Sequence, residues 1–174
     1  MNQRPEPTEY APYYEGYVGL VPEHDIQAAL TAQLDEVLTL LRPVPEAVGN
    51  LRHPPYTWSV KEVVGHLTDG ERIFGYRALR ISRGDTTPLA SFDENEFARA
   101  ANFDRFPLAD LVAEFETGRR NSLWLFRHLP AEGWTRIGTA SNNPVSVRAL
   151  AYIMVGHVRH HLAILRKRLA GEVS

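Results

Sequence analysis

The C-terminal stretch carries the feature that most constrains the fold, an apolar stripe at helical spacing that includes two histidines. The stripe recurs at four- and three-residue intervals and consists of Leu150, Met154, His157, His161 and Leu165. This spacing is typical of one face of an amphipathic helix in the seam of a helical bundle. The sequence therefore predicts a helix from Ser146 to about Ala170, with Gly171 as its stop.

Three further segments show helical periodicity. The first runs from residue 23 to about residue 42 and ends before prolines, and the third runs from residue 107 to about residue 129. The second is expected to reach residue 82 or 83, and it begins at Ser59, which forms a capping box with Glu62. Each segment is long enough to expose one polar face and bury one apolar face.

The segments between the predicted helices differ in length. Residues 84–106 form a long second connection, in which a short helix is expected to begin at Asp93. A short hairpin is expected around residues 134–140, followed by a turn at Asn142, Asn143 and Pro144. Four amphipathic helices with a long second connection predict an all-α four-helix bundle.

The first 22 residues form a separate N-terminal arm in this interpretation. Prolines interrupt the arm, so we expect it to be irregular, yet four tyrosines crowd it between residues 10 and 17. Tyrosine side chains need a surface to pack on, so we expect the arm to lie ordered against the bundle. The predicted organisation is an arm at residues 1–22 and a bundle domain at residues 23–174. The tyrosines, Trp134 and residues 88–103 are candidates for a pocket mouth or a dimer contact.

Composition narrows the class of protein and its partners. A chain of 174 residues with 44% hydrophobic and 23% charged residues is the size and character of one globular domain. Its net charge of -2 and its scattered arginines argue against a nucleic-acid partner. No apolar run approaches the roughly 18 residues of a membrane span, and the first residues resemble no signal peptide. We therefore expect a cytoplasmic protein with no membrane partner.

The chain contains no cysteine, which excludes thiolate metal sites, disulfides and a cysteine nucleophile. Other catalytic motifs are also absent. The sequence has no glycine-rich phosphate loop and no GxSxG elbow, and Val158 follows His157 where an HExxH motif would need glutamate. Any metal must therefore be held by nitrogen and oxygen ligands.

Histidines occupy two positions of the C-terminal stripe where buried apolar residues are expected. A buried histidine is costly unless both ring nitrogens have partners. His157 and His161, at i and i+4, point from one helix face and can share a metal ion. His66 lies seven residues beyond its helix cap and His157 eleven beyond its own, so both project at similar angles. The three form a candidate metal site, with hydrogen-bonded core histidines of a purely structural bundle as the alternative.

Neighbouring polar residues are candidates for a supporting role. His160 adjoins His161, but His161 continues the apolar stripe, so we assign His160 as a flanking residue that supports the site. Asp69 lies three residues after His66 and could orient a ligand or serve as a base. A solvated helix face explains Asp69, Glu71 and Arg72 equally well. Surface or capping roles suffice for the remaining histidines, His24, His53 and His128.

Two motifs together resemble the DinB/YfiT-like superfamily. They are Trp58–Arg72, with the sequence WSVKEVVGHLTDGER, and Gly156–His161, with the sequence GHVRHH. The resemblance extends from the first predicted helix to the C-terminus. It implies a four-helix bundle of unusual connectivity, commonly a homodimer, with a three-histidine metal centre. Matched by position, the implied ligands are His66, His157 and His161, and the implied divalent metal is zinc or nickel.

The resemblance also suggests a chemistry. Some relatives transfer low-molecular-weight thiols such as bacillithiol or use mycothiol in an isomerase, and others are described as metal-dependent hydrolases. We therefore expect a metal-dependent enzyme that activates a low-molecular-weight thiol in an S-transferase type of reaction on a small-molecule substrate. The alternatives are a hydrolase that uses metal-bound hydroxide and a non-catalytic metal-binding or stress-response bundle.

Overall fold

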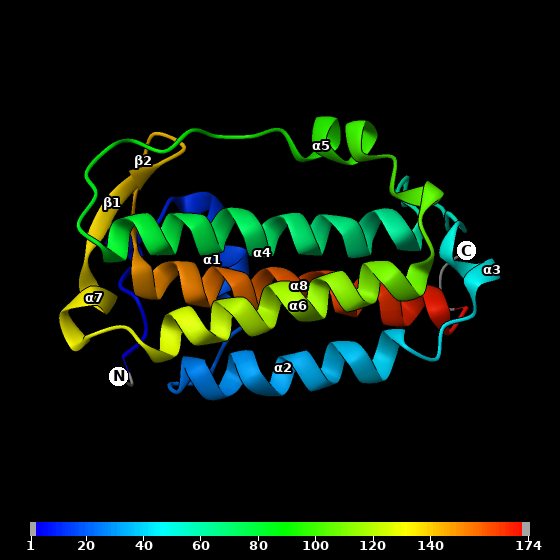
Figure 1. Cartoon of the computed structure of the whole chain (residues 1–174), viewed down its shortest axis with the longest axis horizontal. Helices are drawn as coiled ribbons and strands as arrows, with labels where there is room; N and C mark the ends of the chain where they lie inside the picture. The colour runs from blue at the N-terminus through cyan, green and yellow to red at the C-terminus, as the bar shows by residue number, and fades with distance from the viewer. Residues whose placement is uncertain (1–2, 172–174) are drawn as a thin grey trace.

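The computed structural model describes residues 3–171, and four long helices form its body (Figure 1). The four helices are α2 (Ile26–Leu41), α4 (Val60–Ser82), α6 (Leu108–Arg127) and α8 (Val147–Leu169). The all-α four-helix bundle that the sequence predicts is confirmed. None of the described helices is both long and apolar enough to cross a membrane.

Side-chain caps fix where three of the four helices begin. Ser59 and Glu62 form the predicted capping box at the start of α4, and Ser146 accepts a hydrogen bond from the amide of Ala149 in α8. Helix α2 begins at Ile26, three residues later than predicted. The reason is that the Asp25 carboxylate accepts the amide of Ala28 and so occupies the N-cap position.

The connectivity of the bundle explains its long second connection. Helices α4 and α2 lie on opposite sides, and each contacts both α6 and α8 between them (Figure 1). The chain colours show that α4 and α6 run in the same direction, opposite to α2 and α8. Two neighbouring parallel helices cannot be joined by a short turn, so the chain must return along the length of the bundle.

The second connection, residues 83–107, is structured. It contains α5 (Glu94–Ala101), which the Asp93 side chain caps as predicted, and a 3-10 turn at Phe103–Arg105. Phe103 packs against α4 at Gly65, where a Cβ atom would lie 2.4 Å from the Phe103 ring. The absence of a side chain at Gly65 therefore lets the connection lie close to α4.

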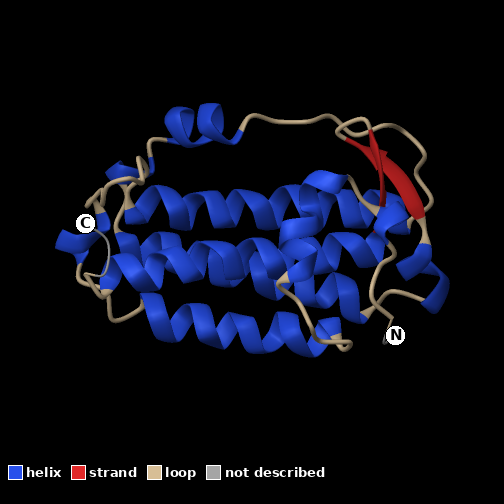
Figure 2. Cartoon of the chain, turned by 180° about the vertical axis from the view of Figure 1, so that it is seen from behind, coloured by secondary structure: helices blue, strands red, loops and turns tan. Residues whose placement is uncertain are grey.

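A small hairpin precedes α8 at one end of the bundle (Figure 2). Strands β1 (Ile137–Ala140) and β2 (Asn143–Ser146) pair antiparallel. The predicted hairpin at residues 134–140 was misplaced, because Trp134 lies in a short helix, α7 (Ala131–Thr135). The predicted turn at Asn142, Asn143 and Pro144 is correct for Asn142 only, because Asn143 and Pro144 begin β2.

The N-terminal arm packs on α8. It is made of 3-10 turns at Pro7–Glu9 and Pro12–Tyr14 and the short helix α1 (Glu15–Gly19), so the expectation of an irregular arm was wrong. The expected packing is observed: α1 contacts α8, and Val18 is buried. Another short helix, α3 (Glu46–Gly49), lies between α2 and α4. The division into an arm and a bundle domain stays a prediction.

Candidate metal centre

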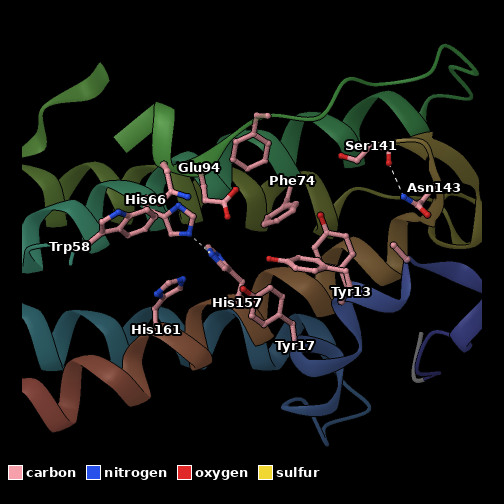
Figure 3. Close-up of a pocket in the computed structure, with 14 residues that line it drawn as sticks. Tyr13, Tyr17, Trp58, His66, Phe74, Glu94, Ser141, Asn143, His157 and His161 are labelled. Atoms are coloured by element: carbon pink, nitrogen blue, oxygen red, sulfur yellow. Dashed lines mark hydrogen bonds between the residues drawn. The ribbon is translucent and has the colours of Figure 1, made fainter. Parts of the chain in front are cut away.

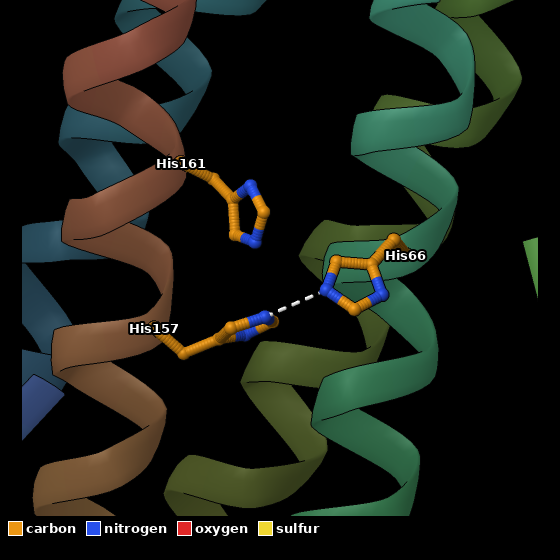
Figure 4. Close-up of side chains that lie close together, drawn as sticks. All are labelled: His66, His157 and His161. Atoms are coloured by element: carbon orange, nitrogen blue, oxygen red, sulfur yellow. Dashed lines mark hydrogen bonds between the residues drawn. The ribbon is translucent and has the colours of Figure 1, made fainter. Parts of the chain in front are cut away.

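Three histidines from two antiparallel helices meet in the interior of the bundle. His66 comes from α4, and His157 and His161 come from consecutive turns of α8 (Figure 4). One ring nitrogen from each residue lies within 4.8 Å of the others. The Nε2 atoms of His66 and His157 are 2.8 Å apart and share a hydrogen bond. The structure thus brings together the three residues that the sequence singles out.

Small and aromatic residues shape the space around the rings. Gly70 faces His157 from α4, and a Cβ atom there would lie 3.0 Å from the ring carbon Cε1. Trp58 packs edge-on against His66, with ring centroids 4.8 Å apart, and Tyr17 packs in the same way against His157 at 5.5 Å. The glycine makes room for the ring of His157, and the aromatic contacts limit the orientations of both histidines.

Burial keeps the three imidazoles neutral. It lowers the pKa of His66 to about 4 and the pKa of His157 well below its usual range. Burial, followed by the charges of His66 and His160, lowers the pKa of His161 to about 3. Neutral imidazole is the form that binds a metal ion. The site therefore requires no proton loss from these rings at neutral pH.

The donor set fits a divalent metal ion. An ion about 2 Å from each nitrogen requires ligand atoms within about 4 Å of one another. The ligand nitrogens lie within 4.8 Å of one another, and modest rotation of the rings would bring them to that spacing. Three nitrogen ligands leave further coordination positions for water or substrate, as in catalytic rather than structural zinc sites.

The two proposed supporting residues lie outside this cluster. His160 is exposed, and its ring lies against Tyr17, 5.6 Å between centroids, and 5.1 Å from the ring of His161. The Asp69 carboxylate pairs with Arg72 at 3.4 Å. Burial raises the pKa of Asp69, while Arg72 opposes that shift. A supporting role for either residue stays a prediction.

The interpretation of Glu71 as part of a solvated face is wrong. Glu71 is buried and forms an ion pair with Arg119 of α6 at 2.6 Å, with both side chains at most 2% exposed. Gln33 of α2 accepts a second hydrogen bond from Arg119 and donates to the carbonyl of Val155 in α8. This polar network joins the four long helices. Sequence analysis missed it, because an arginine next to another arginine, Arg120, gives no sign of which one is buried.

A cavity of about 480 Å³ opens onto the histidines (Figure 3). Its wall combines α4, α8, the N-terminal arm, the second connection and the hairpin, so the segments that the sequence left between helices complete the site. The lining residues are Ala11, Tyr13, Tyr14, Tyr17, Trp58, His66, Phe74, Phe92, Glu94, Asn95, Ser141, Asn143, His157 and His161. Tyr13, Tyr14 and Tyr17 of the arm therefore line a pocket, whereas Tyr10 is buried in the core and Trp134 is buried against Phe126.

Aromatic rings dominate this lining, and Glu94 at the start of α5 is its one carboxylate within residues 3–171. Burial raises the pKa of Tyr17, so its hydroxyl stays protonated at neutral pH. A cavity of this size, mostly apolar with a few polar groups, is typical of a small-molecule site. No spacing along the chain would gather these residues, because they come from segments that lie far apart in the sequence.

A four-helix bundle in which antiparallel helices bring three histidines to an aromatic cavity defines a class of metal-binding bundles. Comparison with a family model places the chain: the DinB superfamily model matches residues 29–165, and the chain belongs to that family. The resemblance inferred from the two sequence motifs is thereby confirmed. No curated protein matches the chain.

Solved structures share the fold. One is YfiT from Bacillus subtilis, described as a probable metal-dependent hydrolase with an unusual four-helix bundle topology. It has a TM-score of 0.72 and 14% identity, covering 98% of this chain and 94% of that one. Another is a mycothiol-dependent maleylpyruvate isomerase, with a TM-score of 0.70 and 13% identity, covering 84% of this chain and 61% of that one. At these identities the likeness establishes the fold alone.

Proposed function

We propose that the protein is a divalent-metal enzyme that activates a low-molecular-weight thiol for transfer to a small-molecule substrate. The observation that carries the proposal is the position of three neutral imidazoles in the wall of a cavity large enough for a ligand. His66, His157 and His161 would hold the ion. When bound, it would supply positive charge that lowers the pKa of a thiol or a water molecule.

A thiol suits the site for two reasons. The chain has no cysteine, so a sulfur nucleophile must come from a separate compound. A thiol, with an ordinary pKa of about 8.5, needs a much smaller shift than water to ionise near neutral pH. The likeness to a mycothiol-dependent isomerase supports the same choice.

The residues around the histidines would bind and orient the two reactants. Trp58, Tyr17 and Phe74 pack around the histidine rings and would exclude water from the reacting atoms. Glu94 lies near His66 at the cavity wall, where its carboxylate could accept a proton or bind a positively charged group (Figure 3).

A second candidate is hydrolysis, in which water replaces the thiol. It is favoured by the likeness to YfiT, whose description is that of a probable metal-dependent hydrolase and which matches nearly the whole chain. The histidine site and the cavity serve either reaction. The two candidates differ in whether the substrate is consumed without a thiol.

The test is a paired assay on protein loaded with zinc or with nickel, the two metals that we propose for the site because imidazole binds both. The electrophile monochlorobimane is offered with cysteine, glutathione or bacillithiol, and a nitrophenyl ester is offered without thiol. We expect thiol conjugation that disappears in His66→Ala and persists in His128→Ala, which removes an exposed histidine outside the site. Ester hydrolysis without thiol conjugation would favour the hydrolase. The absence of both activities would refute both reactions for these probes.

We also propose that the chain acts in the cytoplasm as a homodimer, without a nucleic-acid or membrane partner. The scattered arginines and the net charge of -2 support the second part. Light scattering coupled to gel filtration measures the assembly directly. A mass near twice 19.6 kDa would support the dimer, and a mass near 19.6 kDa would refute it.

A further inference from the structure

The end of the cavity farthest from the histidines is built differently from the rest. Ser141 and Asn143, from the hairpin, lie at this end, well away from His66 and His161 (Figure 3). The Asn143 side-chain amide donates to the carbonyl of Ser141 at 2.7 Å. Arg77 of α4 is not in the lining itself; it lies behind Ser141 and shares with Tyr14 and Asn143 a small adjoining space of about 10 Å³. We call Arg77, Ser141 and Tyr14 the distal pocket.

Arg77 is a buried cation without a carboxylate partner among residues 3–171. Its side chain is buried, and its Nη2 atom donates to the carbonyl of Ala90 at 2.8 Å and to Oγ of Ser141 at 3.0 Å. By contrast, the equally buried Arg119 is paired with Glu71. Burying a guanidinium among neutral acceptors is costly, because no opposite charge replaces its hydration. An anionic ligand would supply that charge.

Two hydroxyl groups connect this charge to the cavity. Because Oγ of Ser141 accepts from Arg77, its own O–H is available to donate toward the cavity that it lines. Tyr14 also lines the cavity. Burial raises the pKa of Tyr14, whereas the charge of Arg77 and a hydrogen bond from it lower that pKa. Both hydroxyls are therefore hydrogen-bond donors beside one positive charge.

The backbone holds Ser141 in an unusual conformation. Ser141 and Asn142 form the two-residue turn of the hairpin, with φ angles of 52° and 63°. Such turns favour glycine, asparagine and aspartate, so serine is a costly choice at this position. The Ser141 amide also donates to the carbonyl of Leu89 in the second connection at 3.0 Å. The hydroxyl is thus held in place from both sides of the cavity.

Two charged residues lie at or behind the cavity wall, Glu94 and Arg77, and both influence the pKa of Tyr14. Glu94 lies near His66, whereas Arg77 lies eleven residues farther along the same helix, which is roughly 16 Å of helical rise. Phe74 and Tyr13 line the cavity between these ends (Figure 3), and the ring of Phe92 lies 5.9 Å from the guanidinium of Arg77. The arrangement suits an elongated ligand with an apolar middle and a negative charge at its far end.

We propose that the distal pocket binds a carboxylate group of the substrate, while the reacting end of the substrate lies at the histidines. The second half of this assignment rests on the proposed function. One guanidinium balances one negative charge, which favours a carboxylate over a doubly charged phosphate. Arg77 would supply the charge from behind the wall, and the hydroxyls of Ser141 and Tyr14, which line the cavity, would donate to the carboxylate.

The test uses metal-free protein, so that it does not depend on the metal. Binding of 4-phenylbutyrate and of the neutral 4-phenylbutan-1-ol is measured by titration calorimetry at neutral pH. We expect the acid to bind at least about tenfold more tightly than the alcohol, because hydrogen bonds to a charged group are the stronger ones. Equal affinities, or a preference for the alcohol, would overturn the proposal.

Variants identify the residues that cause the preference for the acid over the alcohol. Arg77→Gln should reduce it to within about twofold, and Ser141→Ala and Tyr14→Phe should each weaken it, because every one of them removes a donor or the charge. Arg72→Gln, an exposed arginine on the same helix, should leave it unchanged. If Arg77→Gln fails to fold by circular dichroism, the other two variants decide. Wild-type preference in both would refute the distal pocket.

The result is separable from the proposed function. Preference for the acid in a protein that binds no metal would keep the distal pocket and refute the metal enzyme. A protein that binds metal and conjugates thiols but shows no preference for the acid would keep the metal enzyme and refute the distal pocket.

Discussion

The Nε2 atom of His157 lies 2.8 Å from the Nε2 atom of His66, although the two residues are 91 positions apart in the chain. One of these nitrogens must carry a hydrogen and the other must accept it, so the accepting ring is neutral. Burial lowers the pKa of both residues and so keeps the donating ring neutral as well. A metal ion at the site would replace this hydrogen bond with two coordinate bonds. The buried pair is thus satisfied without metal and is already in the protonation state that metal binding needs.

The lowered histidine pKa values predict that the metal-free protein loses stability in acid. In the unfolded chain these histidines take up protons below about pH 6.5, whereas the pKa is about 4 for folded His66 and about 3 for folded His161. Between these limits the unfolded state binds more protons, so the free energy of unfolding falls as pH falls. Urea denaturation of the metal-free protein from pH 7.5 to pH 4 measures this dependence.

A histidine variant provides the check on that interpretation. His66→Gln should flatten the decline, because glutamine does not titrate, whereas replacing the exposed His160 by glutamine should change it less. An unchanged slope in His66→Gln would show that other groups cause the acid sensitivity.

Gly156 is predicted to be essential for docking of the N-terminal arm. A Cβ atom at Gly156 would lie 2.0 Å from the carbonyl oxygen of Tyr17, which is backbone and cannot rotate away. Gly156→Ala should therefore displace the arm, reduce the free energy of unfolding by about 1–3 kcal/mol and expose residues 3–22 to protease. Limited proteolysis followed by mass spectrometry measures the exposure.

The control for this variant is Gly75→Ala in α4. The nearest atom to a Cβ there is the Oγ of Ser122 at 3.6 Å, an ordinary contact. Alanine should be tolerated at this position and should stabilise the helix by up to about 1 kcal/mol. Wild-type stability and protease resistance in Gly156→Ala would contradict the close approach of the arm to α8.

Adjacent arginines in α6 are predicted to differ greatly in their contribution to stability. Arg119 is buried and paired with Glu71, whereas Arg120 is exposed and paired with Glu116. Arg119→Ala should destabilise the protein by about 3–5 kcal/mol, because it leaves a buried carboxylate without its partner. Arg120→Ala should cost less than about 1 kcal/mol. Urea denaturation measures both losses. Similar losses of unfolding free energy in the two variants would mean that the buried ion pair contributes no more to stability than the exposed one.

The helices and the histidines were predictable because local rules decide them. The capping box at Ser59 and the stripe through His157 and His161 depend on residues within one or two turns. The number of residues between His66 and its helix cap predicted the direction in which its side chain projects. The antiparallel packing of α4 on α8 then brings His66 into contact with His157.

The walls of the cavity were not predictable in the same way. Tyr14 and Glu94 lie in segments that the sequence marked as candidates for a pocket mouth or a dimer contact, without deciding between the two. Nothing in the sequence pointed to Ser141. The burial of Glu71 and Arg77 also depends on partners in distant segments. Tertiary packing decides such positions, whereas spacing along one helix does not.

The most direct test of the account is the metal content of three proteins purified without an affinity tag or chelator: the wild type, His161→Ala and His160→Ala. Elemental analysis, before and after reconstitution with zinc and nickel, should find roughly one ion per chain in the wild type and in His160→Ala. It should find almost none in His161→Ala. No metal in the reconstituted wild type, or full retention in His161→Ala, would contradict a metal centre at these three histidines.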